Sequence, residues 1–464
     1  MQKHENMTRV IFISCVAVLG GFLFGYDSGV INGTVSALQK AFGSSDVGSG
    51  FNVASMLLGC ALGALLAGRL SDRFGRRSVL IVTAIFFGVS AWGSGIASAS
   101  LEFIVYRVIG GFAVGAASVV CPAYISEVSP SDIRGRLTTL QQMAIVLGLF
   151  FSFLVNYLIA HFSGNAESVF WLGQQAWQWM FWAELVPIIL FFTGLLLIPE
   201  SPRFLVACGR VDQARKVLVG ISAEDEVDRL ISDIRLSLEE GHRPTWKDML
   251  DPATRKIHPL VWIGIALAAL QQLSGINVVF YYGAVLWEAV GFSENNALLI
   301  NVVSGFVNIG STIAAIFLVD RWGRRPLLIF GSMMMAVFLG GLALIFGLAD
   351  AAPDGSLAIE GAMAVAALLF AHLYILSFSV SWGPVVWVLL GEMFPNRFRG
   401  EALSLAGLAM WITNFAITFT FPPMLASLGL GGAYGIYAFF AALGGLFAWR
   451  LIKETKGKTL EEMN

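Results

Sequence analysis

The sequence predicts an all-α integral membrane protein with twelve membrane-spanning helices arranged in two bundles of six. Three observations predict this fold. The 464 residues are 57% hydrophobic and only 13% charged, whereas a soluble domain is about 25% charged. Apolar runs of about 20 residues, the length that a helix needs to cross a bilayer, recur along the chain. Lys and Arg gather in alternate connections between these runs, as the positive-inside rule describes.

The apolar runs fall into two sets of six, which are separated by a charged stretch. The first set lies near residues 9–31, 52–71, 79–98, 102–124, 138–160 and 179–198. The second set lies near residues 258–290, 297–319, 327–348, 362–391, 402–425 and 433–452. Helices are expected because an open sheet edge cannot exist in lipid. We therefore expect an N-terminal bundle at 1–198, a cytoplasmic helical linker at 199–257, a C-terminal bundle at 258–452 and a short cytoplasmic tail at 453–464.

The basic residues predict the orientation of the chain. Under this assignment, 27 of the 29 Lys and Arg residues lie on the side that carries both termini, and only Lys40 and Arg107 lie elsewhere. That side is predicted to be cytoplasmic. The run that starts at Val10 has no Ala-x-Ala cleavage pattern, so we expect a retained first span. The prediction is a multi-pass protein of the plasma membrane, which is the inner membrane in a bacterium, surrounded by lipid.

The two halves carry related motifs. Asp-Arg-Phe-Gly-Arg-Arg at 72–77 recurs as Asp-Arg-Trp-Gly-Arg-Arg at 320–325. Glu-x-x-Pro-x-x-x-Arg-Gly at 127–135 recurs at 392–400, and Glu-Ser-Pro-Arg at 200–203 has a weaker echo in Glu-Thr-Lys-Gly at 454–457. All copies fall on the predicted cytoplasmic side and in the same order. This pattern is typical of parallel repeats of six spans with a substrate site between them.

Acidic and basic residues alternate in these repeated loops and can form ion pairs at a cytoplasmic gate. The candidate gate residues are Asp72, Arg76, Glu127, Arg134, Asp320, Arg324, Arg325, Glu392 and Arg399. An exposed ion pair contributes at most about 1 kcal/mol, so only a network can bias the molecule toward one conformation. The alternative is that these basic loops only set the orientation of the chain.

The seventh predicted span is rich in neutral polar side chains. Within twelve residues it holds Gln271, Gln272, Ser274, Asn277, Tyr281 and Tyr282. Amides both donate and accept hydrogen bonds, as sugar hydroxyls require, and aromatic faces suit the apolar C–H surface of a sugar. On a regular helix Gln272 and Asn277 lie on opposite flanks, so we expect Gly275 to loosen the helix and bring them together. The alternative is hydrogen bonding between packed helices.

These features resemble the sugar porter family of the major facilitator superfamily over the whole chain. The superfamily motif is present at 68–77. Two motifs are more specific to sugar porters: Pro-Glu-Ser-Pro-Arg-Phe-Leu at 199–205 and Gln-Gln-Leu-Ser-Gly-Ile-Asn at 271–277. A fourth motif is similar at 453–457, although Lys453 stands where the family usually has proline. The resemblance is strongest to bacterial hexose and pentose proton symporters and their facilitative glucose-carrier relatives, and it implies transport by alternating access.

The resemblance implies further sugar contacts in both halves. The residues that match family binding positions or add an aromatic wall are Gln142, Asn308, Trp387, Asn414 and Trp411. Gly383 and Pro384 form a candidate gate hinge in span 10, because proline removes a backbone donor. A static kink is the alternative at this point.

Two charged residues lie inside predicted spans, Asp27 in span 1 and Arg107 in span 4. A charge at the centre of a bilayer is costly, so a functional role is the expectation. The resemblance pairs these two positions and implies that the aspartate accepts a proton, although some family members with an aspartate here transport passively. Glu184 matches a second coupling acid, although Gln178 replaces an arginine that the family has nearby. A permanent structural salt bridge is the alternative.

The leading hypothesis is proton-coupled symport of a monosaccharide, D-glucose or a related hexose, with D-xylose next. The alternatives are a facilitative sugar uniporter without proton coupling and a membrane sugar sensor. No nucleophile–base pair, phosphate-binding loop, metal-ligand cluster or basic patch is visible in the sequence, so we expect no enzyme activity, cofactor, metal or nucleic acid. The four Cys residues form no Cys-x-x-Cys pair. The carrier is expected to function as a monomer.

Overall fold

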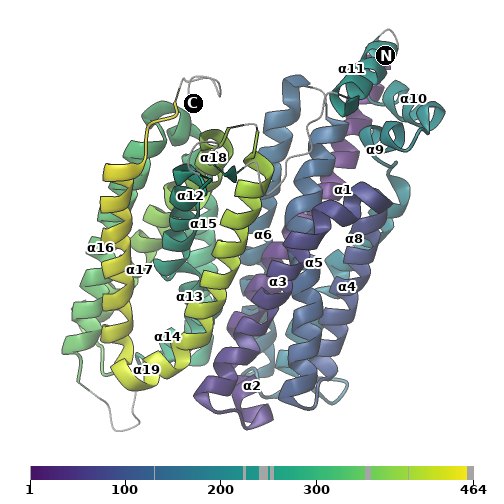
Figure 1. The fold of residues 1–464 in the computed structure, drawn as a ribbon. Coiled ribbons are helices and arrows are strands. Elements are labelled where there is room, and N and C mark those ends of the chain that lie inside the picture. The colour runs from purple at the N-terminus through teal and green to yellow at the C-terminus, as the bar shows by residue number, and fades with distance from the viewer. Residues whose placement is uncertain are drawn as a thin grey trace.

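A computed structural model of the chain describes residues 2–129, 131–222, 226–239, 249–250, 255–350, 357–395 and 397–456. Figure 1 shows two groups of long helices side by side, α1–α8 in one half and α12–α19 in the other. The short helices α9–α11 lie at one end of the first half. Helix α1 begins and α19 ends at this same end, which we call the terminal face. The other end is called the opposite face.

The first half contains eight helices, one 3-10 turn and a two-stranded hairpin. The helices are α1 (Gln2–Val30), α2 (Val35–Phe42), α3 (Asp46–Phe74), α4 (Arg76–Ile96), α5 (Ser100–Val128), α6 (Ser131–Ser163), α7 (Ala176–Trp182) and α8 (Leu185–Leu197). The turn is η1 (Ile31–Gly33), and the antiparallel strands are β1 (Val169–Trp171) and β2 (Gln174–Gln175). The connecting helices are α9 (Pro202–Ala207), α10 (Val211–Val219) and α11 (Val227–Glu239).

The second half is built from helices that are interrupted at three places. They are α12 (Pro259–Leu273), α13 (Ile276–Tyr281), α14 (Gly283–Glu288), α15 (Glu294–Trp322), α16 (Arg324–Leu348), α17 (Gly361–Val380), α18 (Trp382–Met393) and α19 (Arg399–Leu451). The interruptions separate α12 from α13, α13 from α14, and α17 from α18.

The described residues contain eleven helical segments that are long and apolar enough to cross a membrane. The last of them, α19, has 53 residues, which at 1.5 Å per residue would extend about 80 Å, far more than one bilayer requires. Gly429 has φ +67° inside α19 and divides it into two spans. The prediction of twelve spans in two groups of six is therefore confirmed. The predicted seventh span, near 258–290, was too long, because the apolar segment ends at Tyr281 and α14 lies beyond it.

Glycines allow the spans of the first half to pack backbone against backbone. A Cβ atom on Gly59 of α3 would lie 2.1 Å from the carbonyl oxygen of Val108 in α5. A Cβ atom on Gly25 of α1 would lie 1.9 Å from the carbonyl oxygen of Ile145 in α6. Neither distance leaves room for a side chain. Small residues of this kind let membrane helices approach closely, which places the side chains next to them within reach of the neighbouring span.

Two equivalent turns show that the halves are structural repeats. Gly75 ends α3 with φ +96°, and Gly323 ends α15 with φ +92°, a backbone region that favours glycine. The carboxylate of Glu200 accepts a hydrogen bond from the Arg77 backbone at the start of α4 (3.1 Å). Glu454 caps the start of α16 in the same way, through backbone N–H groups. The weak sequence echo between 200–203 and 454–457 is thus a structural equivalence.

Candidate functional site

A break in span 7 assembles the central polar group. Helix α12 ends at Leu273, and Gly275 follows with φ +83° before α13 begins. The Tyr374 hydroxyl donates to the Ser274 carbonyl (2.8 Å), which satisfies a carbonyl group that the break leaves without a helical partner. A Cβ atom on Gly275 would lie 2.6 Å from the ring of Tyr437. The expected role of Gly275 in loosening the helix is therefore confirmed.

A chain of amide hydrogen bonds crosses this break. Asn277 Nδ2 donates to Gln272 Oε1 (2.5 Å), and Gln272 Nε2 donates to Gln271 Oε1 (3.2 Å). Gln271 Nε2 then donates to the Trp382 carbonyl oxygen (2.8 Å) at the break between α17 and α18. The side chains of Gln271 and Gln272 are buried, whereas Asn277 is half-buried. Asn277 is therefore the end of the chain that a small polar ligand can reach most easily.

Two tyrosines that follow this chain in span 7 contact span 11, which also carries Trp411. The Tyr281 hydroxyl lies 3.5 Å from Asn414 Nδ2, and the Tyr282 hydroxyl donates to the Thr418 carbonyl oxygen (2.9 Å). Trp411 is buried, and its ring centroid lies 6.0 Å from that of Phe24 in α1. Trp411 therefore lies at the seam between the two halves.

The other predicted sugar-binding residues lie on α6, α15 and α18, apart from the amide chain of span 7. Asn308 is buried and accepts a hydrogen bond from Ser379 Oγ (2.7 Å), Gln142 is half-buried on α6, and Trp387 is exposed on α18. Within the described part of the chain, no hydrogen bond connects these three side chains to the amides of span 7. The structure thus brings together the span 7 residues but leaves the contributions of α6, α15 and α18 apart.

The predicted hinge in span 10 lies slightly earlier than expected. The helix is interrupted at Ser381, which has φ −117° and ψ −87°, between α17 and α18. Gly383 and Pro384 are already inside the first turn of α18. Proline fits there because the first N–H groups of a helix have no partner within it. The break is therefore at Ser381, and Pro384 only permits α18 to start after it.

The first half holds a buried charged group. Arg107 of α5 pairs with the Asp27 carboxylate of α1 and also donates to the Asp27 carbonyl oxygen (3.1 Å). The Arg107 guanidinium lies over the Phe181 ring, 5.7 Å from its centroid. Glu184 follows α7 in the break before α8, and it is within electrostatic range of both Asp27 and Arg107. The three residues predicted for proton coupling are thus gathered in one place, each only 1% exposed.

Two acidic oxygens in this group have no hydrogen-bond partner among the described residues. They are Asp27 Oδ2 and Glu184 Oε1. Both amide atoms of Gln141 on α6 are also buried without a partner, next to Gly21 of α1. A buried oxygen or amide without a partner is costly unless another state or ligand satisfies it. Gln141 was not among the predicted site residues, because its neighbour Gln142 matched the family position.

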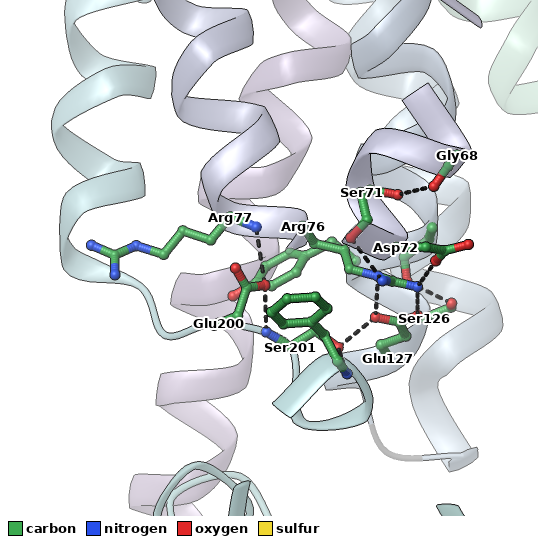
Figure 2. Close-up of polar contacts among 12 residues, drawn as sticks. Gly68, Ser71, Asp72, Arg76, Arg77, Ser126, Glu127, Glu200 and Ser201 are labelled. Atoms are coloured by element: carbon green, nitrogen blue, oxygen red, sulfur yellow. Dashed lines mark hydrogen bonds and ion pairs between the residues drawn. The ribbon is translucent and has the colours of Figure 1, made fainter. Parts of the chain in front are cut away.

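The motifs of the first half meet in one network at the terminal face (Figure 2). The Arg76 guanidinium pairs with Glu127 (2.9 Å) and with Asp72 (2.9 Å). Ser201, in the segment after span 6, donates its hydroxyl to the same Glu127 carboxylate. Figure 2 also shows Glu200 beside the start of α4. The repeated motifs therefore join the ends of spans 2, 3, 4 and 6.

The second half repeats this network. Arg324 pairs with Glu392 (2.9 Å), and Thr455 Oγ1 donates to Glu392 (2.6 Å). Thr455 thus corresponds to Ser201 of the first half. Among the described residues, the ion pairs Arg76–Asp72, Arg76–Glu127 and Arg324–Glu392 each join residues of the same half.

Four predicted gate residues have other surroundings or are not described. Arg325 Nη2 donates to the Trp449 carbonyl oxygen (2.6 Å), and Arg399 Nε donates to the Phe394 carbonyl oxygen (3.2 Å). Cations at the ends of helices are favourable because the carbonyl ends carry partial negative charge. The side chains of Arg134 and Asp320 lie outside the described residues.

The halves meet at the opposite face through a residue that sequence reasoning missed. Asn32 in η1 is buried and donates to the Phe280 carbonyl oxygen (2.7 Å). Its Oδ1 accepts hydrogen bonds from the Ala284 backbone (3.2 Å) and from Asn301 Nδ2 (3.0 Å). The end of span 1 is thereby joined to the break between α13 and α14. The available signal was Ile-Asn-Gly at 31–33, an amide beside a glycine at the end of an apolar run.

Further hydrogen bonds join the halves beyond Asn32. They are Ser36 Oγ to Glu288 (3.1 Å), the Ala166 backbone to Glu294 (2.7 Å), and Asn295 Nδ2 to the Gly164 carbonyl oxygen (3.2 Å). The described contacts between the halves at the two ends of the molecule therefore differ. Described polar contacts join the halves at the opposite face, whereas the described ion-pair networks at the terminal face stay within each half.

Comparisons with known proteins extend over both halves. The family model for "Sugar (and other) transporter" matches residues 13–464. The chain is 50% identical over 463 residues to a glucose transport protein of Synechocystis sp., covering 100% of this chain and 98% of that protein. It is 38% identical over 495 residues to a D-xylose-proton symporter of Escherichia coli, covering 100% and 96%. Its fold is similar to the inward open conformation of the xylose transporter XylE from E. coli, with a TM-score of 0.83 at 37% identity over 98% of this chain and 99% of that one.

Proposed function

The chain belongs to the sugar transporter family of the major facilitator superfamily, and from this membership we propose that it moves a monosaccharide and a proton together across a membrane. It is a transporter and not an enzyme. In such carriers a site between two six-helix repeats is opened to each side of the membrane in turn. The two halves and their seam supply the parts that this mechanism needs.

The amide chain of span 7 is the observation that supports a sugar as the substrate. The bond between Asn277 and Gln272 lies within one span, so it does not serve to hold two helices together. Gln271, in contrast, satisfies a carbonyl at the break in span 10. We therefore assign Gln272 and Asn277 to hydrogen bonding with sugar hydroxyls and Gln271 to positioning them. Each hydroxyl can replace an amide partner without adding a charge.

Further residues are proposed to complete the sugar site. Tyr281, Asn414 and Trp411 adjoin the amide chain or the seam, and Tyr282 positions the end of α13 through its bond to span 11. Gln142, Asn308 and Trp387 are proposed to reach the sugar from α6, α15 and α18. Because the site takes residues from several spans, movement of one half against the other changes its shape.

Asp27, Arg107 and Glu184 are proposed to couple transport to the proton. In the described conformation Arg107 neutralises Asp27, while one oxygen of Asp27 and one of Glu184 stay without a partner. Loss of the arginine contact in another conformation would leave Asp27 as an unpaired buried carboxylate, which favours protonation. Alternation between these surroundings binds the proton in one state and releases it in the other.

The orientation follows from the positive-inside rule. We propose that the terminal face is cytoplasmic, because it carries the clustered Lys and Arg residues. The chain is then a multi-pass protein of the bacterial plasma membrane, acting as a monomer. We propose that the described conformation faces inward, because hydrogen bonds join the halves at the opposite face and the fold is similar to an inward open xylose transporter. The ion-pair networks of the terminal face are proposed to stabilise each half during the conformational change, and Arg134 and Asp320 stay predicted gate residues.

We propose D-glucose or a close hexose as the substrate, with D-xylose next. The Synechocystis relative is a glucose transport protein, and the E. coli relative is a D-xylose-proton symporter. The decisive experiment is counterflow in proteoliposomes with a panel of labelled sugars, followed by uptake with and without a pH gradient. Accumulation that a protonophore abolishes is the expected result. Equal uptake with and without the gradient would instead identify a uniporter, and no counterflow of any sugar would contradict the assignment.

A further inference from the structure

The loop between spans 5 and 6 ends in an apolar hairpin at the opposite face. Strands β1 and β2 form this hairpin, in which Val169, Trp171 and Leu172 are 67%, 60% and 73% exposed. The turn consists of Leu172, with φ +53°, and Gly173, with φ +75°. Two positive φ values favour Asn, Asp and Gly, so a leucine here costs conformational energy. A leucine is expected at this exposed tip only if an apolar surface covers its side chain.

A row of indole rings connects the hairpin to the spans. The ring centroids of Trp171 and Trp179 are 4.9 Å apart, those of Trp179 and Trp182 are 5.2 Å apart, and those of Trp182 and Trp92 are 5.3 Å apart. Trp92 is itself exposed on α4, which is span 3. The exposed surface of the hairpin is therefore continuous with the apolar outer surface of the membrane spans.

The polar edges of two of these rings are satisfied within the protein. Trp179 Nε1 donates to the Trp171 carbonyl oxygen (3.0 Å), and Trp182 Nε1 donates to the Trp92 carbonyl oxygen (3.2 Å). These bonds fix the hairpin on the ends of spans 3 and 6. Val186, one turn after Trp182, is also exposed. The same surface of the first half thus presents ring faces and aliphatic groups together, which suits lipid better than water.

The base of the same loop contacts the second half. The carbonyl group of Gly164 and the backbone N–H of Ala166 bond to Asn295 and Glu294, respectively. Glu167 pairs with Lys40 of α2 (2.6 Å). Only two residues separate this base from Val169 at the start of β1. A force on the hairpin is therefore transmitted directly to contacts that close the opposite face.

We propose that the β1–β2 hairpin inserts its apolar tip into the outer leaflet at the level of the lipid headgroups and thereby braces the closed opposite face. Tryptophan and mixed apolar segments favour this level of a bilayer, where one side of the residue meets acyl chains and the other meets water. The partner is the lipid surface itself. This inference rests on the proposed orientation of the chain but does not involve the sugar or proton residues.

The depth of the hairpin can be measured directly. The full chain, with its four native cysteines replaced by alanine, is given a single Leu172→Cys change, labelled with a nitroxide and reconstituted in vesicles of phosphatidylethanolamine and phosphatidylglycerol. Power-saturation electron paramagnetic resonance then compares collisions with oxygen, which concentrates in lipid, and with a water-soluble nickel chelate. We expect oxygen to dominate at Leu172. A label at Ala41→Cys, on an exposed position of α2, is the aqueous control.

Two results would overturn the anchor. Nickel collisions at Leu172 equal to those at Ala41 would place the hairpin in water. Protection from both reagents, with spin–spin broadening between labels, would show that a second copy of the chain covers it.

The bracing role needs a second measurement. A cysteine at Val35, which is buried at the opposite face, reports opening through its rate of reaction with a membrane-impermeant maleimide. Leu172→Asp is expected to raise this rate several-fold. Leu101→Asp is the matched control, because Leu101 is also 73% exposed at this face but lies in α5, outside the hairpin. Equal rates in the two variants would overturn the bracing role.

Sugar counterflow in the same vesicles separates this inference from the transport function. Normal counterflow with an aqueous Leu172 label would reject the anchor alone. If the label at Leu172 is accessible to oxygen but the unchanged protein, with its native cysteines, shows no sugar counterflow, the transport function alone is rejected.

Discussion

The two halves share one fold but differ in the chemistry of their centres. The first half buries a charged group, in which Arg107 pairs with Asp27 beside Glu184. The second half buries a neutral chain of amides, Gln271, Gln272 and Asn277. Charge in a low-dielectric interior responds strongly to a proton, whereas neutral amides exchange hydrogen-bond partners at little electrostatic cost. We propose that the halves divide the work, with proton binding in the first half and most of the sugar binding in the second.

The largest effect is expected at the charged centre. Asp27→Asn keeps a hydrogen-bond acceptor for Arg107 but removes the titratable group. We expect complete loss of uphill accumulation, while sugar exchange stays within about threefold of the unchanged protein, because an affinity change of that size corresponds to less than 1 kcal/mol. Uptake driven by a pH gradient and counterflow measure the two properties separately.

Asp46→Asn is the matched control for this substitution, because Asp46 is an exposed aspartate in the first turn of α3. Full concentrative uptake by the Asp27→Asn variant would remove the proton role from this residue. Loss of both uptake and exchange would instead indicate the structural salt bridge, since an unpaired buried arginine destabilises the fold.

The neutral centre should show the reverse pattern. Gln272→Ala removes the acceptor of Asn277 and the donor to Gln271, and a buried polar group left without a partner costs about 1–3 kcal/mol. We expect sugar affinity to fall by roughly 10- to 100-fold, while the sugar that does enter is still accumulated against its gradient. Equilibrium binding of labelled sugar measures the first effect. Gln213→Ala, on the exposed surface of α10, is the control. An unchanged sugar affinity of the Gln272→Ala variant would show that Gln272 is not part of the sugar site.

Much of this division was predictable from the sequence, because its signals are local. Charges and amides stand out in apolar runs, so Asp27, Gln272 and Asn277 were found without any contact information. Asn32 and Gln141 were not found, because an amide near a glycine has many harmless explanations until the partner helix is placed. Span 10 shows how a sequence signal can lie near a structural feature without marking its position. The proline predicted a break at Pro384, whereas the helix is interrupted at Ser381.

A smaller effect is expected where the halves meet at the opposite face. Burial, together with the neighbouring carboxylate of Glu294, raises the pKa of Glu288 from 4.5 to about 7. The other groups facing Glu288 are Ser36, Lys40 and Glu167. The Ser36 hydroxyl donates to the Glu288 carboxylate, which favours the ionised form, but burial and Glu294 outweigh this contact. A raised pKa means that protonation of Glu288 stabilises the closed arrangement in which the side chain is buried. That stability is fully present below about pH 4.5 and is lost as the pH rises through about 7.

Opening of the opposite face should therefore increase several-fold between pH 6 and pH 8 by this linkage. Maleimide labelling of a cysteine at Val35, corrected for the reagent's own pH dependence with a free thiol, measures it. Glu288→Gln mimics the protonated carboxyl and should flatten the profile. An equal pH dependence in the two proteins would show that Glu288 is not the group that titrates.

The smallest effect is expected at the terminal face, where the halves are alike rather than different. Glu127 and Glu392 occupy equivalent places, each bound by an arginine and by a hydroxyl from the following segment. The Glu127 side chain is 11% exposed and that of Glu392 is 30% exposed, so water screens the second pair more.

Replacing either glutamate by glutamine should reduce stability by about 1–2 kcal/mol, with the larger loss at Glu127. Thermal unfolding in detergent measures both changes, and the double variant should show their sum because the two glutamates share no partner among the described contacts. A larger stability loss at Glu392 than at Glu127 would mean that burial does not set the strength of these ion pairs. A double variant whose stability loss is much greater than the sum of the two single losses would reveal a coupling between the halves that the described contacts do not contain.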